Sequence, residues 1–409
     1  MAQLVADIGG RPGIDCRGFC EYCYFRHARE VPAFGCRYCS PFRKGCDYCS
    51  RSVGERYTGF RSLSDIGEDI LARLQVLQGE ISRVTISGGG DPSCYPRFTD
   101  LVELLGSMEA PLHIGYTSGK GFGDPKVASF LIDQGLTEVS FTVFAADPLL
   151  RKKYMHDPHP KVSLRVLEEL CGAVDVYAAA VIIPGINDGV VLEKTCAWLE
   201  DRGAKGLIIM RFANSVEQGL ILGNAPLFPH VSVHRVEEFR DLVSDLASRY
   251  ALRITGTPLW DPAIGSPFAI LQEPDLLDKL PRITGDTRVL TGTVAAPFLR
   301  RIITLCGGSA DQVVTAGKEI ACLITADDLA AMDPEVFTPA VVIPGRAFVY
   351  EREAAEIISR DGVERRIIRG PEVLTADGET SMGMTRNQVL ELEMEGLAEL
   401  IRAINRGAE

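Results

Sequence analysis

Short runs of apolar and β-branched residues recur along the first two thirds of the chain, and segments with apolar residues at helical spacing separate them. The runs expected as strands are Leu4–Ile8, Arg83–Ser87, Leu112–Thr117, Glu138–Phe144, Val176–Ile183 and Lys205–Phe212, with Leu252–Thr257 closing or following the set. The segments expected as helices are Ser64–Gln78, Pro96–Met108, Asp124–Gln134, Leu164–Val174 and Val190–Arg202. This alternation predicts an α/β fold with a parallel sheet, and six such units make a partial (β/α)6 barrel.

The character of the chain changes around Leu280–Asp286, and a second α/β pattern begins beyond it. Its expected elements are the extended runs Thr287–Val294, Gln312–Thr315, Glu319–Thr325 and Ala340–Ile343, a helix across Phe298–Leu305, and a C-terminal helix Thr385–Asn405. A charged segment, Glu351–Gly370, lies between the run Ala340–Ile343 and the C-terminal helix. We therefore expect two domains, residues 1–284 and 285–409.

Polar residues and glycines follow several of the expected barrel strands, where function gathers in parallel barrels. Gly88-Gly89-Gly90-Asp91 comes directly after the second strand, and glycines let the backbone approach a ligand closely. Ser118, Asn187 and Arg211 end later strands, where they would point at the barrel mouth and bind a cofactor. Each is equally explained as a turn or cap residue.

Seven of the twelve cysteines lie between Cys16 and Cys49, and the first three form the pattern Cys16-x3-Cys20-x2-Cys23. One short loop with this spacing can wrap three thiolates around three irons of a [4Fe-4S] cubane. The fourth iron then lacks a cysteine and is free to bind S-adenosylmethionine (SAM), a cofactor that supplies radical chemistry. A zinc knuckle that borrows a fourth cysteine from downstream is the alternative.

Four further cysteines form a second set within residues 34–52, which we expect to be a metal loop. They are Cys36, Cys39, Cys46 and Cys49, in two CxxC turns. Two such turns complete a tetrahedral site of four sulfurs, with no position left for a substrate. Zinc and mononuclear iron both suit it, and the spacing does not separate them. Disulfides are the alternative, which a chain without a secretory signal disfavours.

Charge and hydropathy narrow the class of protein further. The net charge is −12 and the pI about 5.2, which argues against general nucleic-acid binding. The first residues contain no basic segment followed by an apolar run, and no stretch of 18 apolar residues occurs elsewhere. We expect a cytoplasmic protein that binds neither membrane nor nucleic acid.

Many motifs in register resemble one family. They include GGRPGIDCRGFCEYCYF, GCRYC, KGCDYCSRSV, TISGGGDPSCYP, GYTSGKGF, IIPGINDGVVLEKT, MRFAN, TGTPLWDPAIGSPFAI, EIACLIT, VVIPGRAFV and SMGMTR. These stretches, spread from end to end, resemble the methanogenesis-marker radical SAM methyltransferases of archaea. The resemblance implies C-methylation of an arginine in the α subunit of methyl-coenzyme M reductase, with SAM, cobalamin and an electron donor.

The same resemblance implies roles for individual residues. Cys16, Cys20 and Cys23 would hold the [4Fe-4S] cluster, and Tyr24 would occupy its open iron. The four-cysteine loop would bind mononuclear iron, and the C-terminal domain would bind cobalamin. A backbone carbonyl near Leu323 would face the cobalt. Acidic residues at the barrel mouth would clamp the substrate guanidinium, with Asp157, Asp188 and Asp261 as guesses.

Two other functions stay open at this point. The first is a radical SAM enzyme that acts on a small molecule or RNA and binds this substrate with its second domain. The second is a non-catalytic scaffold stabilised by iron or zinc.

Overall fold

The computed structural model describes residues 2–28, 59–76, 80–221, 223, 226–258 and 260–407. The expected four-cysteine loop, with Cys36, Cys39, Cys46 and Cys49, lies outside these residues. None of the described helices is long and apolar enough to cross a bilayer.

The first sheet is parallel throughout, and its strands lie side by side in the order of the sequence. Its strands are β1 (Ala2–Asp7), β2 (Ile81–Ser87), β3 (Leu112–Thr117), β4 (Leu136–Thr142), β5 (Asp175–Ile182), β6 (Gly206–Arg211) and β7 (Arg253–Thr257). Sequential order with helical crossovers is the arrangement of an open (β/α) barrel, which confirms the expected fold class. Within the described residues this sheet has seven strands, and the run near residue 252 is one of them.

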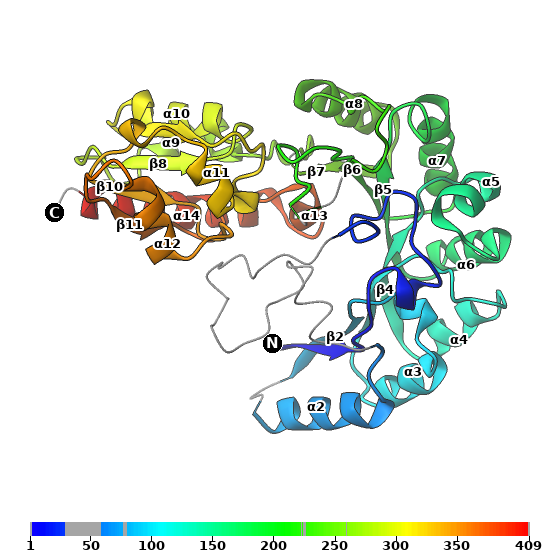
Figure 1. Cartoon of the computed structure of the whole chain (residues 1–409). Coiled ribbons are helices and arrows are strands. Elements are labelled where there is room, and N and C mark those ends of the chain that lie inside the picture. Colours follow the sequence, from blue (N-terminus) through cyan, green and yellow to red (C-terminus); the bar gives the residue numbers. More distant parts are fainter. Residues whose placement is uncertain are drawn as a thin grey trace.

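Helices cover the outer face of this curved sheet in an arc (Figure 1). They are α2 (Leu63–Val76), α3 (Phe98–Gly106), α4 (Val127–Asp133), α5 (Pro148–Leu150), α6 (Pro160–Cys171), α7 (Gly189–Asp201) and α8 (Val236–Arg249). Alternate strand residues, such as Val139 and Phe141, are buried beneath them. Between these two, Ser140 faces the concave side. The main apolar core of this half therefore lies between the sheet and its helices, and the concave face carries polar groups together with a smaller apolar cluster around Ala179 and Ile208.

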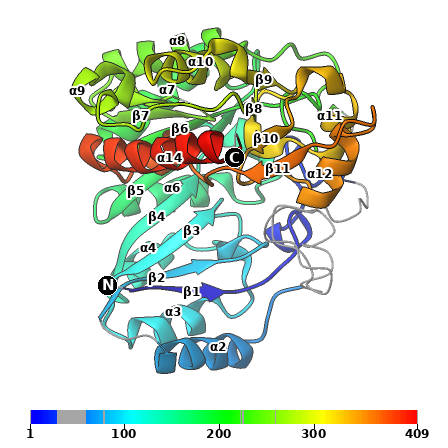
Figure 2. The ribbon, with the colours of Figure 1, turned by 90° about the vertical axis from the view of Figure 1, so that its left-hand side faces the viewer.

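A second parallel sheet has the strand order β11–β10–β8–β9. Its strands are β8 (Arg288–Thr291), β9 (Val313–Thr315), β10 (Ala340–Ile343) and β11 (Arg366–Arg369). The helices of this half are α9 (Pro274–Leu277), α10 (Ala296–Leu305), α11 (Ala326–Ala330), α12 (Glu351–Ile358), α13 (Gly378–Ser381) and α14 (Arg386–Arg406). The chain runs from β8 to β9 on one side and then crosses to β10 on the other, so the order reverses between β8 and β10 (Figure 2).

Each face of the second sheet has its own apolar core. Val289 and Val342 pack with α10 and α14, whereas Leu290 and Val341 pack with α11 and α12. Adjacent residues of one strand point to opposite faces, so both faces are covered and the short strands read as continuous apolar runs.

One expectation for this half was wrong. The run Glu319–Thr325 contains no strand but a short 3₁₀ helix, Ala321–Leu323, because the backbone N–H of Glu319 donates to Glu217 of the barrel half instead of to a ladder. The charged segment Glu351–Gly370, for which the sequence predicted no element, contains α12 and β11, and most of their charged side chains are exposed. The C-terminal helix begins after Thr385, whose hydroxyl caps it, as expected.

The two halves of the chain interlock. Met382, just after α13, packs on the concave face of the barrel against Ala179 of β5 and Ile208 of β6. Thr255 of β7 donates to the carbonyl of Gly378 at 2.7 Å. Conversely, apolar residues from Ile264 to Ile283 pack in the core of the second sheet.

Candidate active site

The cysteine triplet lies in the loop that follows β1, at the carboxyl end of the barrel strands (Figure 2). The backbone N–H of Gly13 donates to the Cys16 sulfur at 3.3 Å. Gly13 has φ of +76°, and a Cβ there would lie 2.0 Å from the Phe19 ring, so only glycine fits. The Cys20 thiol contacts the carbonyl of Met155 at 3.7 Å. The loop is thus a packed structure that docks on the segment after β4.

The three thiols are partly buried. Burial raises the pKa of Cys16 to about 12 and that of Cys23 to about 11, and it also raises the pKa of Cys20. Without a metal they would stay protonated near neutral pH, whereas bound iron would stabilise the thiolates. Within the described part of the chain, no three Cys, His, Asp or Glu side chains converge on a single ion. A cubane needs no such convergence, because each thiolate binds a separate iron.

Two buried polar side chains, Lys120 and Tyr22, lie beside this loop. The ammonium of Lys120 is fully buried and donates to the carbonyl of Gly18 at 2.7 Å. The Tyr22 ring stacks on Phe144 with centroids 4.8 Å apart, and its hydroxyl lies beside the Cys20 thiol. A buried cation and a phenol next to three thiols fit an anionic iron–sulfur cluster.

The glycine triplet after β2 lies against the extension of β1. A Cβ at Gly88 would lie 2.4 Å from the carbonyl oxygen of Gly9, and one at Gly89 would lie 2.4 Å from that of Gly10. The N–H of Gly90 donates to Gly9 at 3.1 Å. Side chains are therefore excluded here by the neighbouring backbone, which brings the cysteine loop close to β2. The binding of SAM by this triplet stays a prediction.

Asp91 ties the end of β2 to the end of β3. Its Oδ1 accepts from the N–H and hydroxyl of Ser93 at 2.9 and 2.7 Å and from the Thr117 hydroxyl at 2.7 Å. Its Oδ2 accepts from the N–H of Ser118 at 2.8 Å and from the Ser118 hydroxyl. Both carboxylate oxygens, and the Ser118 hydroxyl, are thus occupied by the chain itself, and these two residues position the loops.

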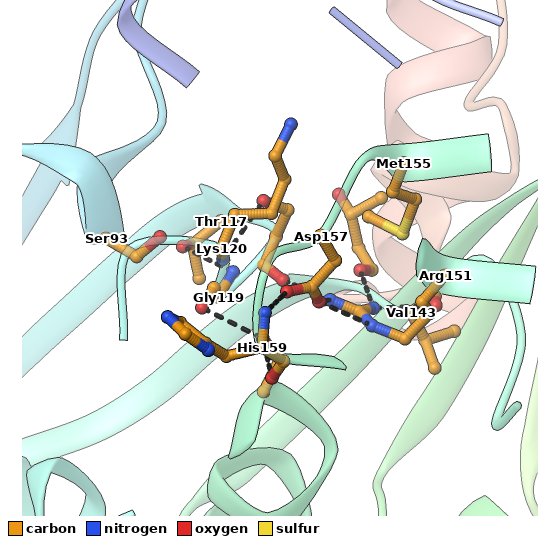
Figure 3. Close-up of polar contacts among 12 residues, drawn as sticks. Ser93, Thr117, Gly119, Lys120, Val143, Arg151, Met155, Asp157 and His159 are labelled. Carbon is orange, nitrogen blue, oxygen red and sulfur yellow. Dashed lines mark hydrogen bonds and ion pairs between the residues drawn. The ribbon is translucent and has the colours of Figure 1, made fainter. Parts of the chain in front are cut away.

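Arg151 likewise joins the end of β3 to the end of β4 (Figure 3). This fully buried guanidinium donates to Asp157 at 2.8 and 3.0 Å, to the Ser118 carbonyl at 2.6 Å and to the Val143 carbonyl at 2.8 Å. Asp157 is fully buried by this pair. It is therefore not available to a substrate guanidinium.

Three other candidate residues also bind their own chain. Asn187 donates to the carbonyls of Phe144 and Val181 at 2.9 and 2.8 Å, and its Oδ1 accepts from a backbone N–H at 2.8 Å. Asp261 is fully buried and pairs with Arg253 at 2.9 Å. Asp188 accepts from the N–H of residue 185 at 2.8 Å but keeps a partly exposed oxygen.

Arg211 at the end of β6 reaches the other half of the chain. Its Nη2 donates to Glu319 at 3.1 Å, its Nη1 makes a second bond to the same carboxylate, and its Nε donates to the carbonyl of His234 at 2.7 Å. The ammonium of the neighbouring Lys318 donates to the carbonyl of Val216 at 2.9 Å. The carboxyl ends of β6 and β9 therefore meet here.

Tyr24 and Leu323 lie near the same junction. The Tyr24 oxygen accepts from the N–H of Ala213, just after β6, at 2.9 Å, and burial raises the pKa of this phenol to about 12. The side chain of Leu323 lies against Gly219, where a Cβ would approach it to 3.1 Å. Binding of iron by Tyr24 and of cobalt near Leu323 stay predictions.

A cavity of about 250 Å³ opens at the carboxyl ends of β8 and β10. Its lining includes Thr291, Ile343, Glu319, Cys322 and Asp377. This is the point where the strand order reverses, which is where open α/β sheets bind ligands. Because Glu319 also binds Arg211, the cavity adjoins the mouth of the barrel.

Comparison with protein families matches residues 12–193 to the Radical SAM superfamily. The chain contains a radical SAM domain. A [4Fe-4S] cluster and SAM are therefore its implied cofactors, and the matched range contains the cysteine triplet, the glycine triplet and the Asp91 network. No curated protein matches the chain significantly.

Several solved structures resemble this chain at a distance. Methylornithine synthase has 12% identity over 76% of this chain and 70% of its own, with a TM-score of 0.36. SuiB from Streptococcus suis, bound to its precursor peptide SuiA, has 13% identity over 67% and 51%, with a TM-score of 0.41. The methyltransferase TsrM from Kitasatospora setae, with cobalamin and a [4Fe-4S] cluster bound, has 14% identity over 46% and 37%, with a TM-score of 0.30. This chain thus spans about half of SuiB and less of TsrM, and such distant likeness carries no inference about substrate.

Sequence reasoning missed four residues of the radical SAM site. Lys120, Arg151 and Glu319 are buried or half-buried polar groups with partners far away in the sequence, and the buried Tyr22 lies beside Cys20. Tyr22 alone carried a sequence signal, because it lies between the second and third cysteines. The others have no local pattern that marks them.

Proposed function

We propose that this radical SAM protein is a cobalamin-dependent methyltransferase that C-methylates an arginine side chain in the α subunit of methyl-coenzyme M reductase. The observation that carries the proposal is the meeting of two carboxyl-end surfaces. The ends of the barrel strands and the cavity of the second sheet are joined by the Arg211–Glu319 pair. Groups bound at the two surfaces would face a shared space.

Cys16, Cys20 and Cys23 would hold the [4Fe-4S] cluster, and the backbone around Gly88–Gly90 would hold part of SAM. Bound there, SAM supplies one-electron chemistry that removes a hydrogen atom from an unactivated carbon. An arginine methylene is neither acidic nor nucleophilic, so methylation of this carbon needs such chemistry. The loop with Cys36, Cys39, Cys46 and Cys49 would hold mononuclear iron.

The cavity between β8 and β10 is the site we propose for part of the corrinoid. Its lining includes the apolar residues Val289, Val342 and Leu400 and the charged residues Glu319, Arg346 and Asp377. At about 250 Å³ it is smaller than a pocket that encloses a whole drug-sized ligand. It would therefore hold one part of cobalamin and leave the remainder toward the barrel, on the side of Leu323.

The substrate proposal rests on the sequence resemblance and on charge. The net charge of −12 favours an arginine-bearing segment over nucleic acid. Of the three acidic residues guessed as a clamp, only Asp188 keeps a partly exposed carboxylate. We propose a protein substrate, a separate electron donor and a cytoplasmic location.

A peptide assay tests the function. The chain, reconstituted anaerobically with iron, sulfide, cobalamin, SAM and a reductant, is incubated with an α-subunit peptide that contains the target arginine. We expect a mass gain of one methyl group, placed on carbon by fragmentation, and no gain when the arginine is replaced by lysine. SAM cleavage without peptide methylation or bound cobalt would instead favour a radical SAM enzyme with another substrate.

Metal analysis tests the partition of the cysteines. We expect about five irons and four sulfides per chain, one iron lying in the four-cysteine loop. Cys20→Ala should lose the cluster and SAM cleavage but keep the single metal, and Cys36→Ala should lose about one metal ion. Cys306→Ala, in the second core, is the control and should keep both the cluster and the single metal ion. Loss of the same metal in both loop variants would contradict the partition.

A further inference from the structure

We propose that Lys120 is a positioning residue of the iron–sulfur cluster, whose buried charge fixes the cysteine loop and makes the cluster easier to reduce. This inference rests on the radical SAM domain and its cysteine triplet, and it does not depend on the methyltransferase proposal. It concerns a residue outside the cysteine triplet and the glycine triplet.

The first step of the argument is the burial of the charge. Lys120 follows β3 in the run Thr117–Lys120, and its side chain is 0% exposed. No carboxylate of the described residues forms an ion pair with it; its ammonium donates to a carbonyl, that of Gly18. An ammonium removed from water without a counter-charge costs several kcal/mol in proteins.

The neighbouring acidic groups form no ion pair with Lys120. The Asp91 carboxylate keeps its charge, because its donors Ser93, Thr117 and Ser118 are neutral, but it bonds to these residues and not to the ammonium. Asp157 is neutralised by Arg151, and Figure 3 shows the Lys120 side chain pointing away from that pair. The ammonium is therefore free to interact with another negative group that it faces.

That group is the cysteine loop. Gly18, the acceptor, lies between Cys16 and Cys20, and both Cys20 and Cys23 lie within electrostatic range of the ammonium. The contact is reciprocal, because Nη1 of Arg17 donates to the Lys120 carbonyl at 3.1 Å. Two bonds in opposite directions thus fix the loop to the end of β3.

The consequence for the cluster follows from electrostatics. A cubane with three thiolate ligands carries a net negative charge, which grows by one electron on reduction. A fixed, buried cation beside the cluster stabilises the more negative state. Lys120 therefore raises the reduction potential of the cluster, while Arg151 contributes little because Asp157 balances it.

The experiment compares full-length variants by an anaerobic redox titration followed by electron paramagnetic resonance of the reduced cluster. Lys120→Met keeps the length of the side chain and removes the charge and the donor. We expect it to bind iron and sulfide with a reduction potential that is more negative than that of the wild type. Lys120→Arg keeps the charge and should lie close to the wild type. Lys126→Met, an exposed lysine of the same loop, is the matched control and should change nothing.

Every outcome decides the proposal. A full cluster with an unchanged potential in Lys120→Met would overturn it. If Lys120→Met fails to bind the cluster while Lys120→Arg succeeds, the charge is needed for assembly, which supports it. If both variants lose the cluster, the shape of the side chain and not its charge holds the loop, and the proposal is wrong.

Discussion

Asp91 is the polar centre of the barrel edge, because five donors from three residues converge on its carboxylate. Each donor comes from a segment that ends β2 or β3. A carboxylate accepts such bonds more strongly than a neutral group does. The loops around the cysteine triplet are therefore held by a charged residue that needs no ligand.

Replacement of this carboxylate should destabilise the fold. Asp91→Asn places an amide N–H₂ opposite donors and leaves at least one buried donor unsatisfied, so we expect a loss of about 2–4 kcal/mol in the free energy of unfolding. Urea denaturation of the anaerobic protein measures it. Asp124→Asn is the control, because the Asp124 carboxylate accepts a bond from an exposed backbone N–H and its replacement should change stability by less than about 1 kcal/mol. Equal effects of the two variants would contradict the assigned role.

His113 makes the stability depend on pH. It lies on the concave face of the barrel between Thr85 and Ser140, at 3.2 and 3.3 Å. Burial, together with the charge of Arg83, lowers its pKa from 6.5 to about 4, although Glu138 lies 3.4 Å away and pairs with Arg83. Because the folded state resists protonation, the unfolded state binds more protons between pH 6.5 and pH 4. The contribution of neutral His113 is complete above pH 6.5 and is lost as the pH falls toward 4.

A variant isolates this contribution from that of the carboxylates. Between pH 7 and pH 4, His113→Gln should lose less stability than the wild type, by roughly 2–3 kcal/mol. His230→Gln, at an exposed position, should follow the wild type. Chemical denaturation at several pH values measures the difference, and parallel curves for all three proteins would show that His113 does not titrate as described.

At the scale of elements, the junction of β6 with the segment after β9 decides how the two sheets face each other. Arg211 and Lys318 are both buried there, and each bonds to the opposite half of the chain. The backbone N–H of Glu319 also donates to Glu217 at 2.8 Å. Side-chain charge and main-chain bonds thus fix the same contact.

Removal of the guanidinium should loosen this junction. Arg211→Met leaves Glu319 without its partner, and we expect a loss of about 2–4 kcal/mol, less than for a fully buried pair because Glu319 is partly exposed. Hydrogen exchange should rise in residues 213–220 and 316–323, and cobalt retention should fall. Arg235→Met, which removes an exposed pair with Glu238, is the control. Unchanged exchange in Arg211→Met would mean that the main-chain contacts suffice.

At the scale of the whole molecule, each sheet packs against residues that come from the other half of the sequence. Met382 fills the concave face of β5 and β6, and a Cβ at Gly378 would lie 2.2 Å from the backbone of Gly256. Phe268 and Ile270, which precede residue 285, belong to the second core. The folding of each half therefore depends on the other.

Truncation tests this dependence. A chain that ends at residue 284 would expose the apolar residues between Ile264 and Ile283 and the concave face of β5 and β6. We expect an aggregated product, or one without a cooperative thermal transition, whereas the full chain should unfold cooperatively. Circular dichroism and size-exclusion chromatography distinguish these results. A soluble, cooperatively folding fragment would establish residues 1–284 as an independent domain.

The sequence by itself determined the α/β alternation, because buried strands and amphipathic helices differ in their local hydrophobic period. It also marked the cysteine triplet and the glycine triplet, whose chemistry depends on the spacing of neighbours along the chain. Local spacing likewise led to the error at Glu319–Thr325, where an apolar run is held by a contact with a distant segment.

Only the tertiary structure decided which polar side chains at the strand ends are left without hydrogen-bond partners within the chain. Asp91, Asn187 and Arg211 are equally polar in the sequence, yet their partners lie up to 108 residues away and satisfy them within the chain. The isolation of the Lys120 charge was decided in the same way. Burial and pairing arise from segments that meet in space, and no periodicity of the sequence records which segments those are.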